Sequence, residues 1–299
     1  MSQFLLLAAV LLGLGLLVRR ARPAGALADH LNWWIVNLAF PATVLELVPG
    51  LHFSGQLWFL VIPQWGLAAG TALLFHALGT RLGWTRTRIG TFTLLTAFSN
   101  TGMLGYPLLE ALRGREGIAL AVLADQLGCF IGLAVGGAML VAVYSGNQPD
   151  ARLIARRIVT FPAFIALLVA LAVSAAGGWP APVPPLLHRL SQTLAPLALF
   201  SMGLRLSVHL RRGQRAAAAF ALAWKLALMP LLAWLLGHAA RVQGLPLTVG
   251  VLETAMAPTF TAAILARQHE LDHELTDTLM SLGMLLSFLT VPAWSLLLP

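Results

Sequence analysis

The chain has 299 residues, of which 59% are hydrophobic and only 10% are charged, and its mean hydropathy is +0.83. These values exclude a soluble globular domain, because apolar runs near 20 residues recur along the chain and each is long enough to cross a bilayer as a helix. The single cysteine, Cys129, excludes an intramolecular disulfide and a metal site built from cysteines. The net charge of +8 comes largely from arginines in the predicted loops, so it does not indicate a nucleic-acid partner.

The apolar segments predict an all-α integral membrane protein with ten transmembrane helices. They are expected over residues 3–18, 30–48, 57–79, 89–112, 118–144, 159–177, 187–205, 215–239, 246–266 and 275–297. The first apolar run is followed, and not preceded, by Arg19, Arg20 and Arg22. A signal peptide carries its charges before the apolar run, so this run is predicted to be the first membrane span.

The arginines in the loops predict which side of the membrane each loop faces. With the N-terminus outside, only Arg113, Arg115 and Arg241 fall on outer loops. The inner loops hold Arg19, Arg20, Arg22, Arg81, Arg86, Arg88, Arg152, Arg156, Arg157, Arg205, Arg211, Arg212, Arg215 and Arg267. Because inner loops carry the excess of basic residues, both termini are predicted to lie outside.

Matching segments in the two halves predict an internal repeat. Leu38–Pro41 resembles Leu194–Pro196, and Glu110–Arg113 at the end of the fourth helix resembles Ile264–Arg267 at the end of the ninth. A repeat of five helices has an odd number of spans, so its second copy enters the membrane inverted, as in many secondary transporters. The predicted division is 1–144 for the first repeat, 145–158 for a basic cytoplasmic linker and 159–299 for the second repeat.

The fourth predicted helix contains a stretch that is expected to be broken, from Ala97 to Leu109. Pro107 has no N–H and crowds the carbonyl of Met103, while Gly102 and Gly105 lower the cost of non-helical backbone. Unwound backbone at membrane depth survives only inside protein or along a wet cavity. The polar residues at this break, Ser99, Asn100 and Thr101, are therefore candidates for a binding site.

The ninth predicted helix has a matching break at Ala257-Pro258-Thr259. Interrupted helices in corresponding positions of two inverted repeats mark the binding site of many transporters. The two breaks are expected to cross near the middle of the membrane. Half-helix N-termini at such a crossing offer unpaired N–H donors to an anion, and freed carbonyls suit a cation.

Several motifs resemble those of the auxin efflux carrier family, in its bacterial members. They are Asn100-Thr101-Gly102-Met103-Leu104-Gly105-Tyr106-Pro107, Asp125-Gln126, Glu253-x-Ala255-Met256-x-Pro258, and the segment from Leu265 to Asp272. The resemblance covers nearly the whole chain and implies a scaffold of helices 1, 2, 6 and 7 with a moving domain of helices 3–5 and 8–10. It also implies elevator-like transport of organic anions and a homodimer. Ala257-Pro258 departs from relatives that carry two prolines there, which affects the expected substrate but not the fold. The bile-acid/sodium symporters share the implied architecture.

Three charged residues are expected inside the membrane. A lysine at the centre of a span costs about 2.5–3.5 kcal/mol, so Lys225 is expected to face the interior with Asp125 or Glu253 as its partner. Lys225 holds the negative charge of a substrate, replaces a coupling cation, or forms a structural ion pair. Asp125 and Glu253 are candidates to carry a coupling proton, and Asp125 and Gln126 to contact the substrate.

His269-Glu270-Leu271-Asp272-His273 fits the H-E-x-x-H signature of zinc proteases, but it falls in the predicted loop between helices 9 and 10. Asp272 is better explained as the N-cap of the tenth helix. A zinc site also needs a third ligand, and no acid, histidine or cysteine follows Asp277. An intramembrane zinc protease is therefore the weaker alternative, and no metal or cofactor is expected.

These observations predict a secondary transporter of the cytoplasmic membrane, not an enzyme, that carries a small organic anion with H⁺ or Na⁺ as the coupling ion. Its partners would be the substrate and membrane lipid. The alternatives are a sodium-coupled symporter of the bile-acid type and a sensor that binds without moving cargo. The predicted site comprises Asn100, Thr101, Gly102, Gly105, Pro107, Asp125, Gln126, Lys225, Glu253, Ala257, Pro258 and Thr259.

Overall fold

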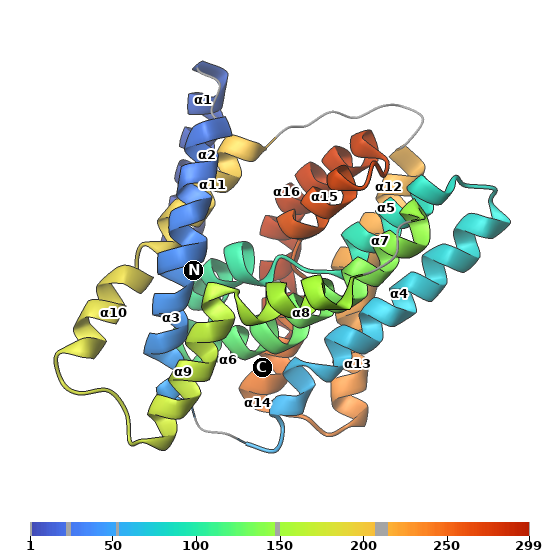
Figure 1. Cartoon of the computed structure of the whole chain (residues 1–299). Coiled ribbons are helices and arrows are strands. Elements are labelled where there is room, and N and C mark those ends of the chain that lie inside the picture. The colour runs from blue at the N-terminus through green and yellow to red at the C-terminus, as the bar shows by residue number, and fades with distance from the viewer. Residues whose placement is uncertain (1, 22–24, 52–53, 147–149, 207–214, 299) are drawn as a thin grey trace. The chain divides into compact units, whose positions relative to one another are not determined.

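The computed structural model describes residues 2–21, 25–51, 54–146, 150–206 and 215–298 (Figure 1). Over these ranges the chain forms helices and no strand, and the one isolated β-bridge pairs Ser99 with Pro258. The prediction of an all-helical protein is therefore confirmed. Arg22, Arg211 and Arg212, which contribute to the sidedness argument, lie outside the described residues, and the position of the termini outside stays a prediction.

Contacts within the chain divide it into two compact units. Unit 1 comprises Met1–Phe53, Gly102–Val122 and Ile158–Leu206, and unit 2 comprises Ser54–Thr101, Leu123–Arg157 and Ser207–Pro299. Each unit thus draws on segments from both halves of the sequence. The predicted boundaries of the two repeats at 144 and 159, and the assignment of a scaffold and a moving domain, stay predictions.

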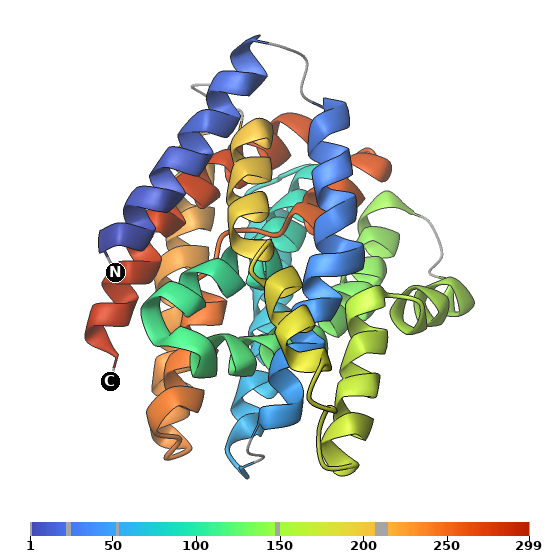
Figure 2. The ribbon, with the colours of Figure 1, turned by 90° about the vertical axis from the view of Figure 1, so that its left-hand side faces the viewer.

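Unit 1 combines helices from its first chain segment with helices from its last chain segment. Its elements are α1 (Ser2–Ala21), α2 (Gly25–Trp34), the π-helical η1 (Ile35–Ala39), α3 (Phe40–Leu47), η2 (Val48–Gly50), η4 (Thr101–Gly105), α6 (Tyr106–Leu123), α9 (Pro162–Ala175), α10 (Val183–Ser191) and α11 (Leu194–Arg205). The first residue of η4, Thr101, and the last residue of α6, Leu123, belong to unit 2. The pair α1 and α11 packs closely (Figure 2). A Cβ added to Gly203 would lie 3.0 Å from the Cα of Gly15, so two glycines allow the two backbones to meet.

Unit 2 surrounds one buried helix. Its elements are η3 (Leu57–Leu60), α4 (Ile62–Arg81), α5 (Arg86–Ala97), η5 (Ala124–Phe130), η6 (Leu133–Gly137), α7 (Ala138–Ser145), α8 (Ala151–Val159), α12 (Arg215–Ala223), η8 (Trp224–Leu228), α13 (Met229–Ala239), α14 (Gly244–Thr254), α15 (Phe260–Gln268) and α16 (His273–Leu297). Every residue of α5 from Ile89 to Ala97 is buried. Thr91 and Thr96 are accommodated there because each hydroxyl donates to a carbonyl one turn earlier, at 3.0 and 2.6 Å.

Five helical segments of the described chain are long and apolar enough to cross a membrane, namely Gly25–Gly50, Leu57–Arg81, Thr101–Ser145, Arg215–Ala239 and His273–Leu297. A sixth results if α8 and α9, which are bent by 57°, count as one span. Thr101–Ser145 would be about 68 Å long as a straight helix, about twice the thickness of the hydrocarbon layer. Gly114 interrupts it with φ of 66° and ψ of −162°, within the loop predicted between residues 112 and 118. Ten spans in two inverted repeats stay a prediction.

The predicted helix 187–205 is wrong in one respect, because it consists of α10 and α11 with a turn between them. The N–H and the hydroxyl of Thr193 both donate to the carbonyl of Leu190, at 3.1 and 2.7 Å, which closes a tight turn before α11 begins. Other predicted helices are divided by π-helical segments, such as η5 and η8, and these carry the charged residues discussed next.

Candidate functional site

Two interrupted helices of unit 2 are joined at their breaks. The helix α5 ends at Ala97, and α14 ends at Thr254 before α15 begins at Phe260. The N–H of Asn100 donates to the carbonyl of Ala257 at 2.7 Å, and the N–H of Thr259 donates to the carbonyl of Phe98 at 3.3 Å. The two unwound segments therefore run antiparallel and satisfy part of each other's backbone, as buried non-helical backbone requires.

Proline suits the position opposite Ser99. Ser99 and Pro258 lie opposite each other between these two hydrogen bonds. The pairing therefore requires no backbone N–H from either residue. Pro258 has no N–H and leaves no buried donor without a partner. The sequence predicts a break at this proline, and the structure has one.

The position of the first break needs a correction. The non-helical residues are Phe98, Ser99 and Asn100, whereas Pro107 lies in the first turn of α6. Proline is tolerated in a first turn, and the π-helical η4, with its wider spacing of hydrogen bonds, precedes it. Gly102, Gly105 and Pro107 belong to unit 1, so they follow the joined breaks along the chain without being part of the site described in unit 2.

Lys225 is fully buried in η8 and is held by a hydroxyl. Its Nζ donates to the Oγ of Ser99 at 2.6 Å and lies 4.0 Å from the sulfur of Met229. The hydroxyl of Ser99 is thus a partner that the structure gives to this lysine, and the predicted ion pair with Asp125 or Glu253 stays a prediction. The break supplies the contact because the hydroxyl of Ser99 points at the lysine from the unwound segment.

Asp125 is tied to the first break from η5. Its Oδ1 accepts a short hydrogen bond from the hydroxyl of Thr101, and its Oδ2 accepts one from the Nε2 of Gln126 at 2.8 Å. One turn further on, the Sγ of Cys129 donates to the carbonyl of Ser99 at 3.0 Å. The segment η5 thus contacts both a side chain and a carbonyl of the unwound backbone.

Glu253 is the least satisfied group of the site. It is fully buried in the last turn of α14, and neither carboxylate oxygen has a hydrogen-bond partner within the described part of the chain. It is close enough to Asp125 and Lys225 to interact with both charges. An isolated buried carboxylate is very costly, so this position favours a bound proton or cation.

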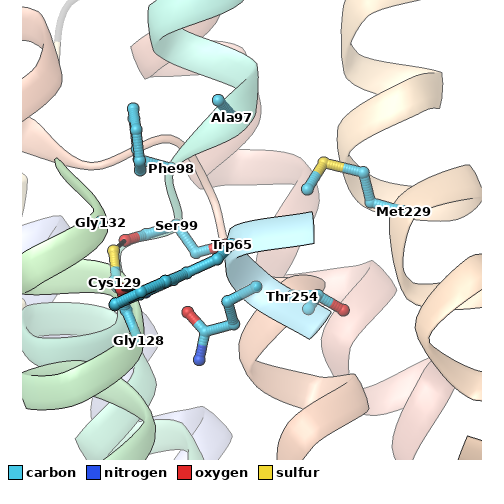
Figure 3. Close-up of a pocket in the computed structure, with 10 residues that line it drawn as sticks. Trp65, Ala97, Phe98, Ser99, Gly128, Cys129, Gly132, Met229 and Thr254 are labelled. Atoms are coloured by element: carbon cyan, nitrogen blue, oxygen red, sulfur yellow. Dashed lines mark hydrogen bonds between the residues drawn. The ribbon is translucent and has the colours of Figure 1, made fainter. Parts of the chain in front are cut away.

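A small cavity opens beside the first break (Figure 3). Its walls include Trp65 and Cys129 on one side and Met229 on the other, and about 10 Å³ of it is open to the centre of a water molecule. That is room for about one water, whereas ligand pockets usually measure about 300–1,000 Å³. In this conformation the site is closed around its own side chains.

The structure brings nine of the predicted site residues into unit 2, where they lie at the breaks and on η5, η8 and α14: Asn100, Thr101, Asp125, Gln126, Lys225, Glu253, Ala257, Pro258 and Thr259. Three contributors are absent from the predicted set. Ser99, which contacts Lys225, is among the polar residues named at the first break but is not in that set. Cys129 follows Asp125 by four residues, a spacing that puts both on one helical face, so its position was readable from the sequence. Gly283 on α16 was not readable, since only the tertiary structure shows that a Cβ there would lie 2.5 Å from the Cδ of Pro258.

The H-E-x-x-H segment does not form the helix that zinc proteases need. His269 follows the last residue of α15, Glu270 has a positive φ of 53°, and His273 begins α16. Asp272 is the N-cap of α16, because its side chain accepts from the N–H of Leu275 at 3.0 Å. The N-cap prediction is confirmed, and the two histidines do not share a helical face.

Comparison with known proteins agrees with this architecture. Residues 3–295 match the family described as membrane transport protein. The chain belongs to this family, which is the auxin efflux carrier family that the motifs resemble. An uncharacterized transporter of Methanothermobacter thermautotrophicus is 28% identical over 273 residues, which cover 91% of this chain and 89% of that protein. One of Methanocaldococcus jannaschii is 25% identical over 275 residues, which cover 89% of this chain and 88% of that protein.

Membership of the membrane transport protein family makes the chain a multi-pass membrane transporter and not an enzyme. Both of these relatives are archaeal, so they do not support the predicted bacterial origin.

Proposed function

We propose that this family member is a secondary transporter that moves a small organic anion, a carboxylate, across the cytoplasmic membrane. Alternating access would be elevator-like, with the helices that carry the joined breaks moving against the remaining helices. The observation that carries the proposal is the antiparallel pairing of the two breaks, since interrupted helices with unwound backbone line the sites of many secondary transporters.

An anion suits the charges of this site. The N-terminus of α15 follows Thr259 directly, and the first N–H groups of a helix favour negative charge. Lys225 contacts the hydroxyl of Ser99 and the sulfur of Met229, and its ammonium group can donate to a carboxylate when the cavity widens. Asn100 is buried on the paired backbone, directly after Ser99, the residue that contacts Lys225.

Coupling to a proton is the second part of the proposal. Within the ranges that the structure describes, the Glu253 carboxylate has no hydrogen-bond donor as a partner, and Asp125 and Lys225 lie within electrostatic reach of it. The net charge of this cluster rises by one when it gains a proton and falls by one when a monovalent anion enters. Binding of the anion and of the proton would then favour each other, which is the requirement for coupled transport.

Electrical recording from proteoliposomes on a solid-supported membrane tests the proposal. The reconstituted protein is challenged with monocarboxylates and dicarboxylates, with and without sodium, at two pH values. Asn100→Ala is compared with Asn37→Ala, because the Nδ2 of Asn37 bonds to the carbonyl of Trp33 at 2.8 Å in unit 1, whereas the paired breaks belong to unit 2. A current that Asn100→Ala abolishes and Asn37→Ala preserves supports a carboxylate site at the joined breaks.

Each of the other outcomes would correct a different part of the proposal. A current that requires sodium makes the protein a sodium-coupled symporter, and a current that Asn100→Ala leaves intact moves the site elsewhere. If no acid gives a current, radiolabel counterflow detects electroneutral exchange. Binding of a carboxylate without flux in either assay would make the protein a sensor, and absence of both binding and flux overturns the proposed substrate class.

A further inference from the structure

The short helix α8 (Ala151–Val159) carries basic and apolar side chains mainly on different sides, and the proposed transport function does not explain this arrangement. At about 100° per residue, Arg152, Arg156 and Arg157 fall within an arc of about 140°. Leu153 falls between Arg156 and Arg157 on the same arc. Ile154, Ile158 and the small or apolar residues Ala151, Ala155 and Val159 fill the opposite arc. None of the nine side chains of α8 is buried, although Ile154 and Ile158 are partly covered by the rest of the chain. The helix therefore presents a mainly basic face and an apolar face, and Val159 on the apolar face is 59% exposed.

The position of α8 in the chain puts it at a membrane surface. It lies between the candidate span that ends at Ser145 and the apolar helix α9, and the chain bends by 57° between α8 and α9 (Figure 2). Nine residues span only about 14 Å, less than half of the hydrocarbon layer. Each arginine at the centre of that layer would cost about 2.5–3.5 kcal/mol, so α8 is excluded from the hydrocarbon.

The chain covers the apolar face of α8 only in part, so the remainder needs a partner outside the chain. An isolated helix of nine residues is marginal in water, and α8 has no buried side chain to stabilise it. Asp150 supplies a local N-cap, because its side chain accepts from the N–H groups of Arg152 and Leu153 at 2.9 and 3.2 Å. A cap and a segregated surface are typical of helices that lie in the membrane interface with their apolar face among acyl chains.

We propose that α8 lies in the plane of the membrane and binds the headgroups of anionic phospholipids. Its arginines match phosphate in charge and in geometry, since a planar guanidinium can donate two parallel hydrogen bonds to it. Ile154 and Ile158 enter the acyl boundary beneath them. The linker between the two predicted repeats is thereby an anchor that responds to the charge of the lipid.

Native mass spectrometry of the full chain measures this directly. The purified protein is titrated with phosphatidylglycerol and with phosphatidylcholine. The test variant replaces Arg152, Arg156 and Arg157 together by glutamine. The matched control replaces three dispersed exposed arginines by glutamine, Arg20, Arg81 and Arg215, and so removes the same total charge. Replacement of the α8 arginines by lysine keeps the charge and removes the planar guanidinium.

A basic residue near an anionic surface contributes about fivefold in affinity, so the α8 glutamine variant should lose at least tenfold in phosphatidylglycerol binding. The dispersed control should lose less than threefold, and the lysine variant should fall between. Equal losses in the α8 variant and the dispersed control would overturn the proposal, as would no loss in the α8 variant. Monodisperse elution and unchanged thermal stability establish that each variant is folded.

A second readout reports where α8 lies. Trypsin cleaves after arginine in exposed chain, so α8 should be protected in vesicles that contain phosphatidylglycerol and cleaved in vesicles of pure phosphatidylcholine. Ile154→Asp keeps the three arginines but disrupts the apolar face, and it should restore cleavage in the anionic vesicles. Equal cleavage in both vesicle types, or protection only when a soluble polyanion is added, would mean that α8 does not bind the membrane surface, and it would overturn the proposal.

Discussion

Gly283 on α16 is predicted to hold the second break in place, and Gly283→Ala tests this. A Cβ at this position would lie 2.5 Å from the Cδ of Pro258 and 3.2 Å from the Cδ2 of Leu222. Carbon atoms in contact are normally about 3.5–4.0 Å apart, so Pro258 or α16 must move by about 1 Å. Pro258 is paired with Ser99, and the displacement therefore reaches the residue that holds Lys225.

The expected magnitude follows from two opposing effects. Overpacking of a filled site costs about 1–3 kcal/mol, while replacement of glycine by alanine inside a helix gains about 1 kcal/mol. The variant should therefore fold with a slightly lower stability. A misplacement of about 1 Å at a binding site can reduce the rate about 100-fold, so transport should fall by one to two orders of magnitude.

The assay compares initial transport rates and thermal stability in the same preparations. Gly66→Ala on α4 is the matched control, because nothing lies within 4 Å of a Cβ added there, and it should leave transport unchanged. Pro258→Ala removes the Cδ that clashes, so combining it with Gly283→Ala should show a coupling between the two sites. Normal transport by Gly283→Ala, or additive effects in the double variant, would refute the reasoning.

Three further changes have defined outcomes. Lys225→Met should abolish carboxylate-dependent current at near-normal stability, because it removes the cation and keeps the apolar stem; a current like that of the unmodified protein would contradict the role of the lysine. Thr101→Val should lower stability by about 1–3 kcal/mol, since it removes a donor to the buried Asp125, and a thermal melt unchanged within error would contradict this. Gly203→Leu should destabilise the packing of α1 and α11 severely, whereas Gly13→Leu, where a Cβ would meet nothing within 4 Å, should melt like the unmodified protein.

The sequence predicts the helical class and the two breaks because both depend on local chemistry. Apolar runs of membrane length, and proline and glycine within them, act on the backbone of their own segment. The N-cap at Asp272 is readable for the same reason, since its partner is the N–H of Leu275 three residues later. Family membership follows as well, because the motifs from Asn100 to Pro107 and at Asp125-Gln126 are contiguous.

Which atoms meet at the site depends on contacts between distant segments. Lys225 and Ser99 are 126 positions apart, and no local pattern indicates that this hydroxyl accepts a hydrogen bond from the lysine. The same is true of Gly283, whose role is to have no side chain where Pro258 approaches. Such contacts are set by the packing of whole helices, and this is why the charged residues could be named from the sequence whereas their partners required the tertiary structure.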